Sequence, residues 1–149
     1  MANFTDFMSI EELREALAGK SHEQIMKEVQ DAGIDEVLGK VFMGMVMSFN
    51  ASAAGRESAL IRYDLKDSKK NTVVYFVKIK DGQCTADQED PGEKPRVQIT
   101  TTIALFLKLA AGRLKLLWPI LFGTLRIAGD RIFAAKMKKI FAGNPNVSG

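Results

Sequence analysis

The chain has 149 residues, of which 46% are hydrophobic and 26% are charged, and its net charge is +3. This composition is typical of a globular domain and excludes a disordered or fibrous protein. The longest stretch without a charge, residues 41–55, is shorter than the ~20 apolar residues that cross a bilayer and contains polar side chains, so no membrane span is predicted.

The charge is divided unevenly along the chain. Residues 103–149 hold eight Lys or Arg against one acid, Asp130, whereas residues 1–102 carry a net charge of −4. We therefore expect an anionic surface to meet the C-terminal third. The single cysteine, Cys84, cannot form an internal disulfide and no targeting signal is visible, so a cytoplasmic location is expected.

Helical signals dominate the first third of the chain. Two helices are predicted to begin at capping boxes, in which a serine caps the helix and the residue three positions later reaches back: Ser9 with Glu12, and Ser21 with Gln24. Apolar side chains then recur at helical spacing from residue 35 to residue 49. This pattern predicts a third helix that packs on a core.

The hydrophobic period then changes to two, which is typical of strands with one buried face. Strands are predicted around residues 58–65 and 72–79, with a polar turn between them. Asp81-Gly82 is a hairpin signal that leads into a short strand near Cys84. After an acidic loop over 87–95, Val97–Thr101 is predicted to be a further strand.

Helical spacing returns at residues 103–118, with a break expected at Gly112 and a turn at Pro119. A last strand is predicted over Phe122–Ala128. Asp130 is then placed to cap a final helix, Arg131–Phe141. A run of strands flanked by helices predicts an α+β fold.

Catalytic and metal-binding patterns are missing from the sequence. The single histidine, His22, lies at a predicted helix start and Cys84 lies in a strand, so no nucleophilic or metal centre is expected. The acidic loop lacks the spacing of a calcium loop. The aromatic and basic side chains of the last helix fall on opposite sides, unlike those of a nucleic-acid surface. We therefore predict a non-enzymatic protein with no cofactor, no metal and no nucleic acid.

Three consecutive pieces carry a resemblance to a known family. They are residues 106–114, an apolar helix that ends in Gly112-Arg113, residues 123–130, a strand of the form G-x-L-x-I-x-G-D, and the helix of residues 134–141. In this order they are similar to the closing signature of sterol-carrier-protein type-2 lipid-binding domains. The upstream strands follow in the family's order, so the resemblance covers roughly residues 35–142.

The resemblance implies a twisted, mostly antiparallel five-stranded sheet covered by helices, with an apolar tunnel between the layers. It implies binding, and intermembrane transfer or presentation, of a sterol, fatty acid or fatty acyl thioester. The nine Phe and seven Met of the chain suit a predominantly apolar pocket. The residues expected to contact the ligand are Phe106, Leu109, Leu117, Trp118, Phe122, Phe133, Met137 and Phe141.

Several alternatives stay open within this resemblance. The linker around Trp118 is bulkier than the family's, so Trp118 is expected either to line the tunnel or to plug it. The alternative function is an enzyme, or an enzyme-assisting subunit, acting on lipid thioesters or steroids with Asp64 or Asp130 as a tuned acid. Arg131, Lys138 and Lys139 are expected to touch anionic membranes.

The domain prediction is a single unit. It divides into an N-terminal helical extension over 1–34, a sterol-carrier-protein-like domain over 35–142 and a tail over 143–149. The N-terminal helices have no placed counterpart in the family. They are expected either to cover a sheet edge or to support a homodimer.

Overall fold

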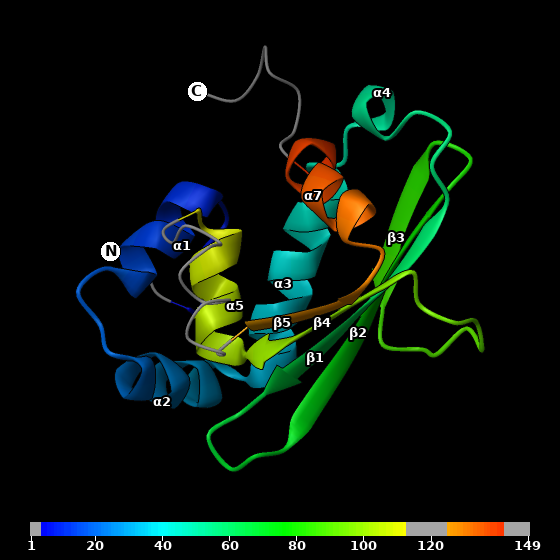
Figure 1. Ribbon diagram of the computed structural model, residues 1–149. Coiled ribbons are helices and arrows are strands. Elements are labelled where there is room, and N and C mark those ends of the chain that lie inside the picture. The colour runs from blue at the N-terminus through cyan, green and yellow to red at the C-terminus, as the bar shows by residue number, and fades with distance from the viewer. Residues whose placement is uncertain (1–3, 113–124, 142–149) are drawn as a thin grey trace.

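The computed structural model describes residues 4–112 and 125–141, and it has an α+β architecture in which helices cover one face of a single sheet (Figure 1). The predicted fold class is confirmed. The helices are α1 (Ile10–Leu17), α2 (His22–Ala32), α3 (Ile34–Met47), α4 (Ala51–Ala54), α5 (Ile103–Ala110) and α7 (Arg131–Ile140). The strands are β1 (Ala59–Lys66), β2 (Thr72–Lys80), β3 (Gln83–Asp87), β4 (Val97–Thr102) and β5 (Leu125–Gly129).

The five strands are ordered β3-β2-β1-β4-β5. All neighbouring pairs are antiparallel except β1 and β4, which are parallel, so the sheet is mostly antiparallel as predicted. A parallel pair requires a crossover connection. After β1 the chain forms β2 and β3 on one side of β1, and it then returns to form β4 on the other side. Because side chains alternate along a strand, every second residue faces the helices.

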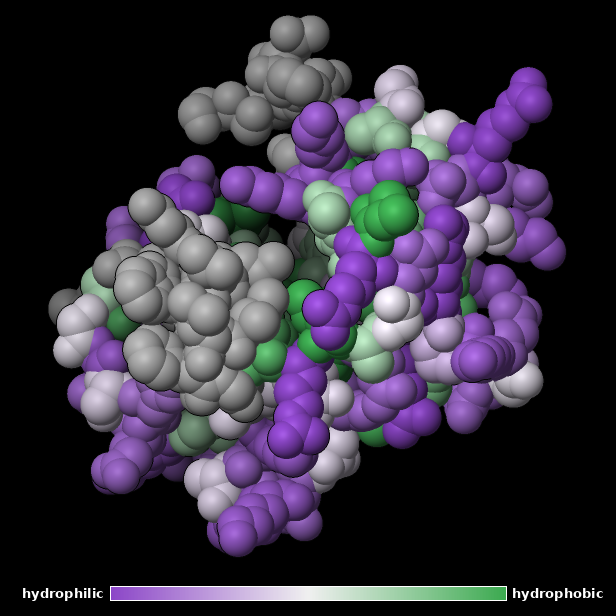
Figure 2. Space-filling view, in the orientation of Figure 1, coloured by the Kyte–Doolittle hydropathy of each residue, from purple (hydrophilic) through white to green (hydrophobic). Residues whose placement is uncertain are grey.

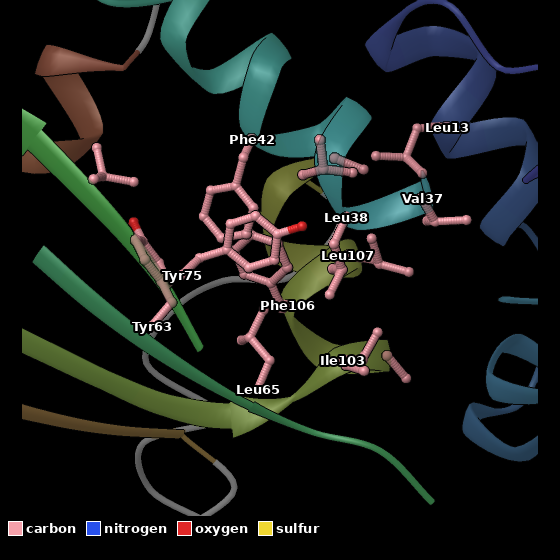
Figure 3. Packing of buried hydrophobic residues seen from close by; sticks show 14 of the residues in the cluster. Leu13, Val37, Leu38, Phe42, Tyr63, Leu65, Tyr75, Ile103, Phe106 and Leu107 are labelled. Carbon is pink, nitrogen blue, oxygen red and sulfur yellow. The ribbon is translucent and has the colours of Figure 1, made fainter. Parts of the chain in front are cut away.

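The helices pack on one shared core. α3 lies over the sheet and α5 packs beside it, while α1 and α2 pack against α5 and α3 from the side away from the strands. Apolar side chains from α1 and α2, such as Leu13 and Ile25, belong to the same buried cluster as Ile61 of β1 and Leu107 of α5. Figure 3 shows the part of this cluster between α3, α5 and the sheet.

The serine caps predicted for the first two helices are present. The Ser9 hydroxyl accepts a hydrogen bond from the Glu12 N–H at 3.1 Å, and Ser21 does the same for Gln24 at 3.1 Å. The carboxylate of Glu12 accepts from the Met8 N–H at 2.8 Å. Each serine thus satisfies one of the N–H groups that the first helical turn leaves unpaired.

The corner between β5 and α7 is held by one arginine. The Asp130 carboxylate caps α7 by accepting from the Phe133 N–H at 2.9 Å, and it also accepts from Nε of Arg96 at 3.0 Å. The Arg96 guanidinium binds Glu57 at 2.7 Å and lies over the Phe133 ring at 4.3 Å. Gly129 has φ of +99°, and a side chain there would overlap the Arg96 carbonyl oxygen.

Candidate functional site

A row of four side chains crosses the helix-facing side of the sheet. Strand register places Tyr75 of β2 beside Tyr63 of β1, Tyr63 beside Ile99 of β4, and Ile99 beside Ile127 of β5. The two tyrosines are only 6% and 4% exposed, but Ile99 and Ile127 are half-buried. The helices therefore cover the row completely over β1 and β2 and incompletely over β4 and β5.

The incomplete cover lies between α5 and α7. Figure 2 shows a hollow beside α7, with hydrophobic residues next to it. Half-buried apolar side chains of the α3 and α7 regions pack against the same core as Ile99 and Ile127: Met45, Phe49, Met137 and Phe141. The ring centroids of Phe49 and Phe141 are 6.2 Å apart. The space above Ile99 and Ile127 therefore has an apolar floor.

An aromatic cluster covers the two tyrosines of the row. The Phe42 ring of α3 is stacked on Tyr75, with centroids 4.2 Å apart, and on Phe106 of α5 at 5.0 Å. Tyr63 meets Phe42 and Phe106 edge-on, at 5.2 Å and 5.5 Å (Figure 3). Stacked and edge-on pairs are both favourable aromatic geometries, so these four rings form a packed apolar wall.

One polar atom is buried in this apolar wall. The Tyr63 hydroxyl donates to the thioether sulfur of Met45 at 3.8 Å, and a thioether is a weak acceptor. Burial raises the pKa of Tyr63 well above its ordinary value, with a smaller contribution from Cys84. The hydroxyl therefore stays protonated at any physiological pH.

The residues predicted to contact a ligand are distributed over several elements. Phe106 is buried in the aromatic cluster and Leu109 is half-buried on α5, whereas Phe133 is fully buried beneath Arg96. Met137 and Phe141 are half-buried in the α7 region, next to the incomplete cover. Leu117, Trp118 and Phe122 lie outside the described residues. The ligand-contacting role of all eight stays a prediction.

Sequence reasoning missed most residues of this site. The strand residues Tyr63, Tyr75, Ile99 and Ile127 were recognised only as parts of strands, and Phe42, Met45 and Phe49 only as parts of a helical stripe. Their alternation along the strands identifies the face on which they lie. It does not indicate how completely that face is covered, because the cover comes from helices that are distant in sequence.

The two acids considered for an enzyme role are both engaged elsewhere. Asp64 lies on the sheet face opposite the helices, where it pairs with Arg62 at 2.8 Å and accepts a hydrogen bond from Gln98. The backbone N–H of Phe133 and then the Arg96 guanidinium lower the pKa of Asp130, so this carboxylate is ionised at neutral pH. Neither acid faces the space above Ile99 and Ile127.

His22 and Cys84 are also far from a reactive arrangement. Burial, followed by the charge of Lys108, lowers the pKa of His22. The half-buried Cys84 thiol has its pKa raised to about 11 by burial, so it remains protonated and is a poor nucleophile at neutral pH. Among the described residues, no group of three or more His, Cys, Asp and Glu is arranged to hold a metal ion.

A second hollow lies at the other end of the molecule. It has a volume of about 330 Å³ and lies between α2, the turn after β1 and the start of α5, where His22, Lys27 and Lys66 line it together with Met26. Its mixture of charged and apolar side chains is open to solvent. It lies between other elements than the space beside α7.

The outer surface of α7 is basic. Arg131, Lys138 and Lys139 are all exposed, as predicted from the helical spacing, and Ile132 is 76% exposed among them. Phe133 and Ile140 point the opposite way into the core. The helices in the described ranges 4–112 and 125–141 are all too short or too polar to cross a bilayer.

Two solved structures of sterol carrier proteins are similar to this fold. Sterol carrier protein 2 from Yarrowia lipolytica in its apo form matches with a TM-score of 0.55 and 16% identity, over 68% of this chain and 90% of the other. Sterol carrier protein 2 like 2 from Aedes aegypti matches with a TM-score of 0.58 and 17% identity, over 72% and 99% of the two chains. These likenesses concern the fold.

An enzyme shares the fold over more of the chain. The stereoselective inverting sec-alkylsulfatase Pisa1 from Pseudomonas sp. matches with a TM-score of 0.60 and 15% identity over 89% of this chain. The present chain spans only 20% of that enzyme, and 28% of the chain of a double mutant of it. A match over 89% of 149 residues must include part of residues 1–34.

The family assignment comes from the sequence itself. No curated protein matches this sequence. The model of the SCP-2 sterol transfer family, however, matches residues 50–142, which is more than half of the chain and contains all five strands, α5 and α7. The resemblance inferred from residues 106–141 is thereby confirmed, and the chain belongs to the SCP-2 sterol transfer family.

Proposed function

We propose that this protein binds a lipid, or another long apolar small molecule, in the space between the inner sheet face and helices α5 and α7. The observation that carries the proposal is that Ile99 and Ile127 are half-buried although they face the helices. A lipid chain laid on them, with Met137 and Phe141 at its side, would remove these surfaces from water. Each Å² of apolar surface so buried contributes about 25 cal/mol.

The ligand classes are those implied by the family: a sterol, a fatty acid or a fatty acyl thioester. A solution structure of palmitated SCP2L2 from Aedes aegypti, which is similar to this chain with a TM-score of 0.51 and 16% identity, supports the fatty acid among these classes. The chain is a carrier that takes the lipid up and releases it at a membrane. Its function needs no reactive side chain.

Membrane contact through α7 fits this role. Arg131, Lys138 and Lys139 form one exposed face, and Ile132 projects from the same face. The three cations attract anionic headgroups by about 1 kcal/mol each. Ile132 would insert into the headgroup boundary. Because the inner side of α7 flanks the proposed lipid space, this contact would bring that space next to the bilayer.

Lipid binding is tested most directly with two neighbouring residues of β5. The purified protein is extracted with solvent, the extract is analysed by mass spectrometry, and the delipidated protein is titrated with diphenylhexatriene, an uncharged fluorescent hydrocarbon. Ile127→Glu places a charge on the floor of the space, whereas Ala128→Glu places the same charge one residue along, on the opposite sheet face. We expect Ile127→Glu to weaken binding at least tenfold and Ala128→Glu to leave it unchanged.

The result that contradicts the proposal is equally definite. Wild-type protein that is folded and delipidated, but neither carries lipid from the cell nor binds the hydrocarbon saturably, has no such site. Circular dichroism melting of both variants separates loss of binding from loss of fold.

A second candidate function is presentation of an apolar substrate to an enzyme. The observation that favours it is the sec-alkylsulfatase match, which extends further along this chain than the match to the carriers. Transfer of a fluorescent lipid between two vesicle populations by the protein alone supports the carrier. Binding without transfer supports presentation.

A further inference from the structure

We infer that the Tyr63 hydroxyl is a polar anchor that selects ligands with an uncharged oxygen, such as a long-chain or sterol alcohol or an ester carbonyl, over ligands with a carboxylate. This inference rests on the proposed function, because it concerns the same apolar space.

The hydroxyl is poorly satisfied in the ligand-free protein. Tyr63 is 4% exposed, and within the described chain its hydroxyl has one hydrogen-bond partner, the Met45 sulfur at 3.8 Å. Buried hydroxyls ordinarily bind stronger acceptors, since a buried polar group without a good partner costs free energy. A ligand oxygen would be a stronger hydrogen-bond acceptor for this hydroxyl than the Met45 sulfur.

The hydroxyl is also within reach of the proposed ligand. Tyr63 lies next to Ile99 in the row across the sheet, at the point where the cover changes from complete to incomplete. Its partner Met45 is half-buried and has the flexible, unbranched side chain that adapts most easily to a new neighbour. A rotation of Met45 exchanges the sulfur for a ligand oxygen without moving the backbone.

The surroundings favour an uncharged oxygen. The residues that face the helices from the described strands are apolar, apart from Tyr63, Tyr75 and Thr101, and include no Lys or Arg. A carboxylate beside Tyr63 would therefore be desolvated with no counter-charge from the sheet, which is far more costly than burying an alcohol. The ring centroids of Phe42 and Phe106 lie 5.2 Å and 5.5 Å from that of Tyr63. These rings leave little room for water that could screen the charge of a carboxylate.

The second tyrosine provides a matched control. Tyr75 lies opposite Tyr63 on the neighbouring strand and is equally buried as a residue. Its hydroxyl points toward Leu38, away from that of Tyr63 (Figure 3). The two Tyr→Phe variants therefore remove the same atom from the same cluster, and only one of them removes the anchor.

The test uses the full chain, delipidated, with diphenylhexatriene as a probe that has no hydrogen-bonding group. The affinity of this hydrocarbon for wild type, Tyr63→Phe and Tyr75→Phe is measured first and serves as the reference for each protein. Displacement of the probe by 1-decanol should require about three- to tenfold more alcohol in Tyr63→Phe, as loss of one hydrogen bond between uncharged groups predicts, and no more in Tyr75→Phe. Decanoate at pH 8 should compete at least tenfold less well than decanol in wild type.

A spectroscopic readout identifies the contact itself. The chain has two tyrosines, so ring-labelled protein gives two ¹³Cζ signals, and Tyr75→Phe assigns the one from Tyr63. Decanol should shift the Tyr63 signal, and the hydrocarbon should shift it less. Equal displacement by decanol in all three proteins, with an unmoved Tyr63 signal, would overturn the anchor and leave lipid binding intact. Failure of the hydrocarbon to bind would instead overturn the proposed function.

Discussion

One glycine determines how β5 turns into α7. Gly129 adopts a φ of +99°, and its Cα approaches the backbone of Arg96 so closely that a Cβ would overlap the Arg96 carbonyl oxygen. That oxygen also accepts a hydrogen bond from the Asp130 N–H at 2.9 Å. The second glycine of the G-x-L-x-I-x-G-D signature is therefore required by backbone geometry.

We expect Gly129→Ala to lower the free energy of unfolding by about 3–4 kcal/mol, because it combines left-handed strain with a backbone collision. Gly82→Ala is the matched control: its φ is also positive, at +74°, but a Cβ there meets nothing within 4 Å. It should cost only about 1–2 kcal/mol. Urea denaturation of both variants measures the difference, and equal losses would show that the collision is relieved.

Asp130 makes a prediction about pH. Its pKa is lowered below the ordinary 3.8 by the Phe133 N–H and by Arg96, so the stabilisation that it provides is fully present above about pH 5 and is lost as the pH falls through its folded pKa. We expect Asp130→Ala to lower the melting temperature at pH 7 by about 2–5 °C. Asp130→Asn retains a capping oxygen and should lose less.

The difference in melting temperature between wild type and Asp130→Asn should shrink between pH 5 and pH 3. The amide of this variant does not titrate, whereas the wild-type carboxylate becomes increasingly protonated as the pH falls. A difference that stays constant down to pH 3 would mean that the ion pair with Arg96 contributes nothing.

At the scale of the element, α7 has one face buried in the core and one exposed basic face. Phe133 and Ile140 are fully buried, and the basic face carries Arg131, Lys138 and Lys139. Reversing these three to Glu changes the net charge from +3 to −3 and should weaken binding to vesicles containing phosphatidylserine at least tenfold at low salt. The same reversal at the exposed Lys69, Lys70 and Lys80 is the control for net charge.

The outcome at high salt is also determined by this mechanism. At 1 M salt the Debye length shrinks to about 3 Å, so wild type should lose most of the same binding. If both triple variants bind the vesicles equally, the net charge of the protein determines the binding and α7 is not the docking face.

The helices and strands themselves were largely predictable, because their signals are local. The caps at Ser9 and Ser21, the hairpin at Asp81-Gly82 and the cap at Asp130 each depend on a few adjacent residues. The helix α4 was missed because four residues are too short to show a helical period. α5 ends at Ala110, just before the glycine at which the break was expected.

The site was predictable only in part, because some of its residues come together from segments that are far apart in sequence. Helical spacing identified Phe106, Met137 and Phe141 as inward-facing residues of α5 and the α7 region. The floor, Ile99 and Ile127, depends on which strand lies beside which and on where α5 and α7 leave the sheet uncovered. These are contacts between segments far apart in sequence, and a single sequence carries no local signal for them.

At the scale of the whole molecule, the N-terminal helices contribute side chains to the core. Ile25 of α2 and Leu13 of α1 are 0% and 3% exposed and belong to the same buried cluster as the sheet residues. Nε of Arg14 donates to the carbonyl of Ala111 at the end of α5, which ties α1 to the family domain. We propose that residues 1–34 stabilise α5 from behind, on the side away from the sheet.

This arrangement predicts one cooperative unfolding transition for the whole chain. Ile25→Ala in α2 and Ile61→Ala in β1 both remove a side chain that is 0% exposed, and each should lower the free energy of unfolding by about 2–5 kcal/mol. If the two parts share one core, either variant shifts the same transition, detected identically by far-ultraviolet circular dichroism and by tryptophan fluorescence. A saturating apolar ligand should raise that transition in both variants by mass action, because only the folded state holds the ligand. An autonomous N-terminal unit would instead give a separate early transition in Ile25→Ala, leave the later transition at its wild-type position, and show the ligand effect on the later transition alone.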